Sequence, residues 1–172
     1  MPGSEPRADH PAQRAFVAVL IIAAVMLVAA PLLLWPTVEI ASSRSSTVKM
    51  GGESVRVTVA DTPFRRAFGL QGRTSLADGD GMLFVFDPPS RQRFERKSVR
   101  MALDVAFVGP DGEILAITPL DARNPRAASP APVAYALELP QGWCAAHGLR
   151  VGDRPSMPAD TQPGARAADP VY

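Results

Sequence analysis

The segment 81–86, Gly-Met-Leu-Phe-Val-Phe, decides the fold that this sequence predicts. It is short and strongly apolar, and turn residues enclose it: Asp-Gly-Asp at 78–80 and Pro-Pro at 88–89. A short apolar run between turn signals is typical of a buried strand. We therefore expect this strand at the centre of the folded region, with the other strands arranged around it.

Apolar and polar residues alternate in several segments on either side of this strand, namely 54–60, 101–108 and 133–139. A turn sequence, Gly-Pro-Asp-Gly, joins 101–108 to a further strand at 113–118, which predicts a hairpin. The proline-rich segment 121–132 has no such pattern and is expected to be a loop. Because no long helix separates the strands, the predicted fold class is mainly β, a small antiparallel two-layer sandwich or open barrel.

One short helix is predicted between the first two strands. Thr62 is suited to the N-cap, Pro63 to the first helical position and Gly69 to the C-terminal cap. Phe64 and Phe68 share one face of this helix, and the arginines at 65 and 66 are expected to face water.

The predicted core combines the apolar faces of three strands. Because side chains alternate across a strand, the large apolar residues of each strand share one face. The residues expected to be buried together are Phe84, Phe86, Leu103, Val105, Phe107, Leu137 and Leu139.

Composition divides the chain into five parts. A polar N-terminal tail (1–14) precedes an apolar segment (15–35), and a serine-rich linker (36–47) leads to the β domain (48–154). The domain has roughly 105 residues, enough for a single core. The last part, 155–172, is rich in proline and is predicted to be disordered.

The segment from Ala15 to Trp35 is predicted to be a transmembrane helix. It contains no charged residue, and a helix of about 21 residues spans about 30 Å, the thickness of a bilayer core. We expect a single-pass anchor in the cell membrane with the β domain outside the cytoplasm. The alternative is a signal segment that is cleaved, which leaves a secreted domain.

The 172 residues carry a net charge of +1, so the chain lacks the overall basic field that nucleic-acid binding favours. A single cysteine, Cys144, excludes a disulfide within the chain. Cys144 and His147 are three residues apart on a predicted helical turn, and they are either a nucleophile–base pair or a buried thiol beside a surface histidine. The other histidine, His10, lies outside the domain, and no catalytic residue, metal site or cofactor is predicted.

Several short motifs follow one another in a defined order along the β domain. They are Ala60-Asp61-Thr62, Gly69-Leu70, Arg73, the segment 81–86, Leu103-Asp104 with Phe107, Leu137-Glu138-Leu139 with Gly142, and Gly152-Asp153. In their order and spacing the chain resembles the domain-of-unknown-function family 192, also called uncharacterised protein family 0127. The resemblance covers nearly all of the domain, and it implies a small, mostly β domain, often exported, with no established reaction.

The chain departs from the family's usual sequence just before the strand at 101–108. The family there typically reads Phe-Trp-Met-Lys-Asn-Thr, whereas this chain has Glu95 and Arg96 between Phe94 and Lys97. Buried positions rarely accept such a change, because an unpaired buried charge is costly. We therefore expect Glu95 and Arg96 to be exposed, at a surface or at the rim of a cleft.

The first group of candidate binding residues is a basic cluster between residues 91 and 100. Within it, Arg96, Lys97 and Arg100 lie close in sequence to Phe94. The cluster is either a solvated strand edge or a surface for anionic groups, such as lipid headgroups, cell-envelope polymers or an acidic protein partner.

The second group is a pair of carboxylates, Asp104 and Glu138, that lie among apolar residues in two strands. They are solvent-facing residues if that sheet face is exposed, and a proton-sharing or ion-paired site if they converge in a cleft. The preferred function is a membrane-anchored extracytoplasmic binding or accessory module of unknown ligand. The alternative is a small envelope hydrolase that uses Asp104 and Glu138 with the basic cluster.

Overall fold

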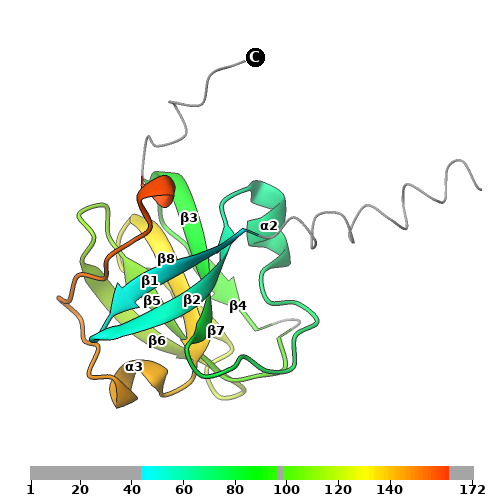
Figure 1. Ribbon diagram of the computed structural model, residues 1–172. Coiled ribbons are helices and arrows are strands. Elements are labelled where there is room, and N and C mark those ends of the chain that lie inside the picture. Colours follow the sequence, from blue (N-terminus) through cyan, green and yellow to red (C-terminus); the bar gives the residue numbers. More distant parts are fainter. Residues whose placement is uncertain (1–43, 97–98, 163–172) are drawn as a thin grey trace, which may run out of the picture. The chain divides into compact units, whose positions relative to one another are not determined.

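The structure, a computed structural model, describes residues 44–96 and 99–162. Within these ranges the chain is mainly β, with eight strands in open sheets and two short helices (Figure 1). The strands are β1 (Ser45–Met50), β2 (Glu53–Ala60), β3 (Asp80–Ser90), β4 (Arg93–Glu95), β5 (Leu103–Val108), β6 (Ile114–Leu120), β7 (Arg126–Ala128) and β8 (Val133–Pro140). The helices are α2 (Pro63–Phe68) and α3 (Trp143–Ala146), with a 3-10 turn, η1 (Ala159–Thr161), near the end.

The predicted transmembrane segment lies outside the described residues. Between residues 44 and 162, apart from 97 and 98, the structure contains no helix long and apolar enough to cross a membrane. The membrane anchor therefore stays a prediction from the sequence.

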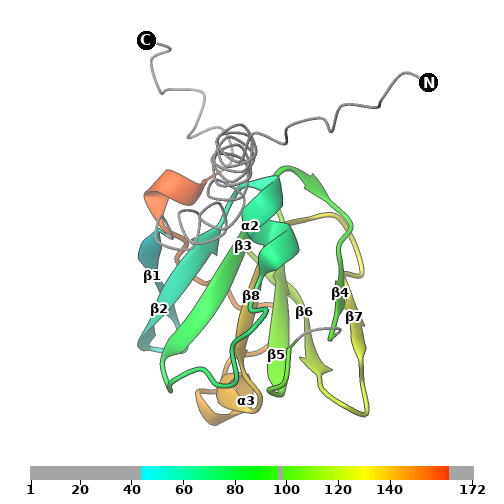
Figure 2. The same cartoon turned by 90° about the vertical axis from the view of Figure 1, so that its right-hand side faces the viewer.

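Six strands form one sheet in the order β1-β2-β3-β8-β5-β6, and β4 and β7 form a second, two-stranded sheet beside it (Figure 2). Most neighbouring strands are antiparallel, as predicted, but β2 and β3 run parallel. The reason is the connection between them, since α2 and the turns after it carry the chain back to the end of the sheet where β2 began.

The central strand β3 contains the segment 81–86, which is buried and pairs with β2 on one side and β8 on the other, as predicted. Gly81 has a specific role in this pairing. A Cβ atom at this position would lie 2.9 Å from the carbonyl oxygen of Glu138 and 2.9 Å from a methyl group of Leu139. Only glycine permits this close approach of β3 to β8.

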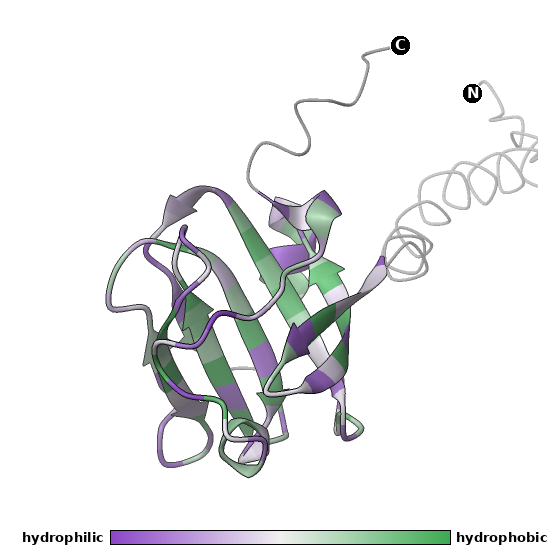
Figure 3. Cartoon of the chain, turned by 60° about the vertical axis from the view of Figure 1, so that its left-hand side comes forward, coloured by the Kyte–Doolittle hydropathy of each residue, from purple (hydrophilic) through white to green (hydrophobic). Residues whose placement is uncertain are grey.

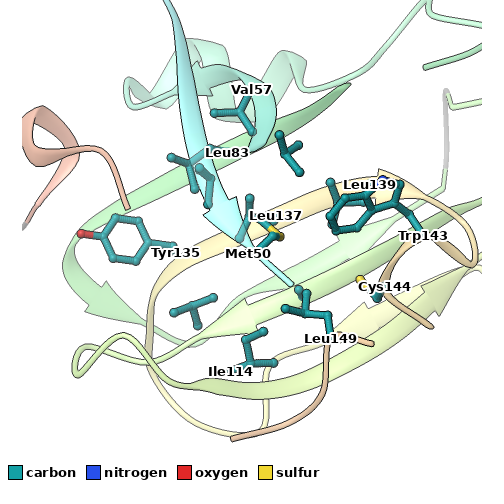
Figure 4. Packing of buried hydrophobic residues seen from close by; sticks show 14 of the residues in the cluster. Met50, Val57, Leu83, Ile114, Tyr135, Leu137, Leu139, Trp143, Cys144 and Leu149 are labelled. Carbon is teal, nitrogen blue, oxygen red and sulfur yellow. The ribbon is translucent and has the colours of Figure 1, made fainter. Parts of the chain in front are cut away.

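Two clusters of buried apolar residues lie on opposite faces of the six-stranded sheet, whose central strands are largely hydrophobic (Figure 3). The first cluster includes Leu137, Leu139 and Trp143 (Figure 4), and the second includes Phe84 and Phe107. All seven residues predicted for the core are buried, but they divide between the two clusters. The reason is that successive side chains of a strand point to opposite faces, and both faces of this sheet are covered.

The folded region extends beyond both predicted boundaries of the β domain. β1 begins at Ser45, inside the predicted linker, and its Lys49 exchanges two backbone hydrogen bonds with Ser156, inside the predicted tail. On the other edge of the sheet, Ile114 donates a backbone hydrogen bond to Asp153. The segment around 152–156 thus bonds to both edge strands. Backbone groups of any residue type make such bonds, so the pattern of side chains does not reveal them.

The segment 121–132 is not entirely a loop, contrary to the prediction. Its residues 126–128 form β7, which pairs with β4 through Phe94 and Ala127, and Ala127 is buried in the second cluster. A strand of three residues is too short for an alternating pattern to show.

Candidate functional site

A groove of about 730 Å³ lies between α2, the outer end of β3 and the small sheet that contains β4. Phe84, Phe86 and Phe94 line it together with the aliphatic side chains of Leu70 and Val99. Volumes of a few hundred to a thousand cubic ångströms are typical of sites for small molecules. The groove is therefore the candidate functional site of the domain.

The helix that forms one wall of the groove has the predicted ends but the opposite orientation. Its N-cap is Thr62, whose hydroxyl oxygen accepts a hydrogen bond of 3.2 Å from the backbone N–H of Arg65, and Gly69 follows the last turn with φ +53°. Phe64 and Phe68 are exposed, at 41% and 36%, with their rings stacked 6.3 Å apart. The helix thus turns its phenylalanines outward, and Phe68 lies at the rim of the groove.

The arginines of α2 are half-buried because the groups beneath them need hydrogen-bond donors. Arg65 forms an ion pair of 3.1 Å with the buried carboxylate of Asp61. Arg66 donates to the carbonyl oxygens of Asp61 and Val85, both at 3.0 Å, and its guanidinium lies 5.7 Å from the ring centre of Phe86. Arg44 also pairs with Asp61, at 3.0 Å, so two guanidinium groups stabilise this buried carboxylate, which is costly to bury unpaired.

Phe84 of β3 and Phe94 of β4 line the groove, and Phe107 of β5 packs against Phe94 without lining it. The ring of Phe94 packs edge-on against Phe84, with ring centres 4.9 Å apart, and against Phe107 at 5.7 Å. Phe94 is half-buried and reaches the second cluster from β4. The predicted site residue Phe94 therefore joins the small sheet to the main one, and it also lines the groove.

Glu138 of β8 lies at the floor of the groove and is only 4% exposed. In the register of the sheet its neighbours are Met82 of β3 and Val105 of β5, both buried in the second cluster. Among the described residues, its Oε2 atom has no hydrogen-bond partner. Burial in these apolar surroundings raises the pKa of the Glu138 carboxyl to about 7. A buried polar atom without a partner is uncommon in native proteins, so this position is the strongest candidate for a functional residue.

Asp104 of β5 points to the other face of the sheet. It lies opposite Leu139, a residue of the first cluster, whereas Glu138 lies opposite Val105, a residue of the second. The carboxylate of Asp104 accepts a hydrogen bond of 2.9 Å from the backbone N–H of Gly142, just before α3. Burial raises the pKa of Asp104, while hydrogen bonds from the backbone near α3 oppose that rise. The two carboxylates do not converge, so the alternative in which they form a shared site, and the hydrolase that would use it, have no geometric basis.

The described residues of the basic cluster lie on and around β4, at the edge of the groove. Glu95 is exposed at the rim of the groove, as predicted, and lies 3.7 Å from the guanidinium of Arg126 on β7. Arg96 is half-buried and not exposed as expected, because its side chain donates a hydrogen bond of 3.1 Å to the carbonyl oxygen of Arg100, a residue that is exposed. Lys97 lies outside the described residues.

Cys144 and His147 do not form a reactive pair. The thiol of Cys144 is buried in the first cluster, and burial raises its pKa to about 12, which keeps it protonated. The ring of His147 stacks on Trp143, and its Nδ1 atom lies 2.9 Å from the carbonyl oxygen of that residue. In the part of the chain that the structure describes, no group of His, Cys, Asp and Glu residues is arranged to hold a metal ion.

Sequence reasoning missed the part of the site that α2 supplies. Arg66 and Phe68 line the groove, although the helix was expected to present the opposite face to the domain. One signal in the sequence does indicate the true orientation. Asp61 ends an apolar strand and lies four residues before Arg65, the spacing of a helical ion pair.

Residues 46–157 match the family DUF192, described as an uncharacterized ACR. Since the match covers more than half of the chain, the protein belongs to this family, which confirms the resemblance seen in the motifs. No curated protein matches the chain.

Two solved structures are similar to this chain. A protein of Sinorhizobium meliloti 1021, described as a putative transcription regulator, is 30% identical with a TM-score of 0.61 over 67% of this chain and 95% of its own. A protein of unknown function from Novosphingobium aromaticivorans DSM 12444 is 29% identical with a TM-score of 0.60, over 66% of this chain and 85% of its own.

Proposed function

We propose that the β domain is a ligand-binding module and that the groove between α2 and β4 is its site. One observation carries this proposal: a buried carboxylate, Glu138, lies at the floor of a groove that is lined in part by phenylalanines, and its Oε2 atom has no partner among the described residues. Binding sites for small molecules commonly combine apolar walls with a few polar groups that orient the ligand. In this groove the phenylalanines supply the contact area, and Glu138 supplies the orienting group.

Binding of a small probe, with and without a tryptophan that blocks the groove, tests this proposal. The probe is 3-phenylpropan-1-ol, a neutral aromatic alcohol, and its binding to the full-length chain is followed by NMR through shifts of the backbone amides. The shifts should map to residues that line the groove. Ala67 is exposed on α2 at the groove, and Ala67→Trp should block the entrance and weaken binding about tenfold, equivalent to roughly 1.4 kcal/mol.

The matched control is Ala145→Trp, which adds the same side chain at an exposed position of the other short helix, α3, away from the lining of the groove. This variant should bind the alcohol like the wild type. Equal affinities in both variants, or amide shifts confined to other parts of the domain, contradict the proposed site.

We further propose that residues 15–35 hold this module at a membrane, with the domain outside the cytoplasm. The proposal is supported by the uncharged apolar length of the segment, which matches a bilayer core of about 30 Å. The expected result is a chain that stays in the membrane fraction at alkaline pH and keeps its N-terminus, as measured by mass spectrometry of the mature protein. A mature chain that begins near Pro31 or Ser42 instead means a cleaved signal and a secreted domain.

A further inference from the structure

We infer that the groove binds a ligand with a primary amine on an apolar, aromatic body, and that the amine lies against the carboxylate of Glu138. This inference rests on the proposed function, since it assumes that the groove is a binding site. It adds the chemical class of the ligand and the residue that selects it.

The state of the Glu138 carboxyl group is the first step of the argument. The side chain is 4% exposed, and among the described residues its Oε2 atom has no donor within hydrogen-bonding distance. Its neighbours on the flanking strands, Met82 and Val105, have no N–H or O–H group in their side chains. A ligand that has hydrogen-bond donors and a positive charge gains the most binding free energy at this carboxylate, because a charge-assisted hydrogen bond is about twice as strong as a neutral one.

The other charged groups along the groove do not supply that charge. Arg66 of α2 is engaged with two backbone carbonyl oxygens and with the ring of Phe86. Arg93 and Glu95 of β4 are exposed at the rim, as is Asp87 near the end of β3. Burial is the cause of the raised pKa of Glu138, and no ion pair joins its carboxylate to any of these described residues. The floor therefore presents one carboxyl group to the ligand.

The aromatic floor favours the same class of ligand. The rings of Phe84 and Phe94 pack edge to face, with ring centres 4.9 Å apart, and both line the groove next to Glu138. The faces of aromatic rings attract ammonium groups, and their surfaces also bury the apolar body of a ligand. An anionic ligand of the same shape can bury its apolar body but gains no attraction from the ring faces, and the carboxylate repels it.

Recognition of an amine should be coupled to a proton. Because burial raises the pKa of Glu138 to about 7, the carboxyl group of the free protein is mostly protonated at pH 6 and mostly ionised at pH 8. The ammonium pairs with the ionised form, so binding at pH 6 releases the proton to solvent. The affinity should then fall about tenfold for each pH unit below 7 and level off above it, since alkylamines stay charged to about pH 10.

The experiment compares three probes of one shape on the full-length chain by titration calorimetry: 3-phenylpropylamine, 3-phenylpropan-1-ol and 3-phenylpropionate. At pH 8 the amine should bind about tenfold more tightly than the alcohol, and the acid more weakly than both. At pH 6, measurements in two buffers of different ionisation enthalpy should show release of about one proton for each amine bound.

Glu138→Gln should reduce the affinity for the amine to that for the alcohol and abolish the proton release, and amide shifts of the groove residues on addition of the alcohol report that the groove stays intact. The control Glu53→Gln, at an exposed position of β2, should keep the preference for the amine. Equal binding of amine and alcohol by the wild type, or a preference that survives Glu138→Gln, overturns this inference and leaves the proposed site standing. If no probe binds in the groove, the proposed function fails as well.

Discussion

Replacing Glu138 with glutamine should make the domain more stable at pH 8 by roughly 3 kcal/mol and change its stability little at pH 4.5. The reason is that burial raises the pKa of Glu138 from 4.5 to about 7 in the folded state. Between these two values the folded state keeps a proton that the unfolded state has released. The contribution of this group to stability is therefore fully present below pH 4.5 and is lost as the pH rises to 7.

Urea denaturation of the full-length chain at pH values from 4.5 to 8 measures this effect. The wild-type free energy of unfolding should fall relative to that of Glu138→Gln across this range, with no further divergence above pH 8. The control Glu53→Gln changes an exposed carboxylate and should follow the wild type within about 0.5 kcal/mol at every pH. If the free energies of unfolding of the wild type and of Glu138→Gln change in parallel with pH, Glu138 has a hydrogen-bond or ion-pair partner in solution.

Phe107→Ala should lower the free energy of unfolding by about 3–5 kcal/mol, a large part of the stability of a small domain. Phe107 is fully buried in the second cluster, where its ring also contacts Phe94 at the floor of the groove. The cost combines the lost burial of the ring with the cavity that remains. The unfolding midpoint of the full-length chain in urea measures it.

Phe68→Ala is the matched control for this change. Phe68 is 36% exposed on α2, so the same substitution should cost about 1 kcal/mol or less. If Phe107→Ala leaves the unfolding midpoint unchanged, the second cluster does not hold the two sheets together. The same follows if Phe68→Ala loses more free energy of unfolding than Phe107→Ala.

The short helix and the central strand could be predicted because the capping and turn residues that delimit them are their neighbours in the sequence. The caps of α2 are Thr62 and Gly69, at its own ends, and the buried strand at 81–86 is enclosed by its own turns. By contrast, the parallel pairing of β2 with β3 and the bonds of Lys49 to Ser156 join groups far apart in the chain. Backbone pairing of that kind depends little on which side chains are present.

The sequence indicates two residues of the candidate site but not the arrangement of the site. Phe94 and Glu138 were singled out, and both line the groove. Asp104 was grouped with Glu138 because each interrupts an apolar strand. The register of β5 against β8 places Asp104 beside Leu139 and so on the opposite face. A shift of one residue in that register would reverse the outcome, and the alternating patterns of the two strands do not determine it.

The sequence by itself determined that this chain contains a mainly β domain of the DUF192 family, with a central apolar strand and one capped short helix, because periodicity, turn residues and motif spacing are local properties. Only the tertiary structure decided which face α2 presents. α2 turns Arg65 toward the buried Asp61, which Arg44 also holds, and leaves Phe64 and Phe68 exposed, because paired guanidinium groups stabilise a buried carboxylate. Tertiary packing also surrounds Glu138 with apolar residues of neighbouring strands at the floor of the groove. This burial raises the pKa of its carboxyl group.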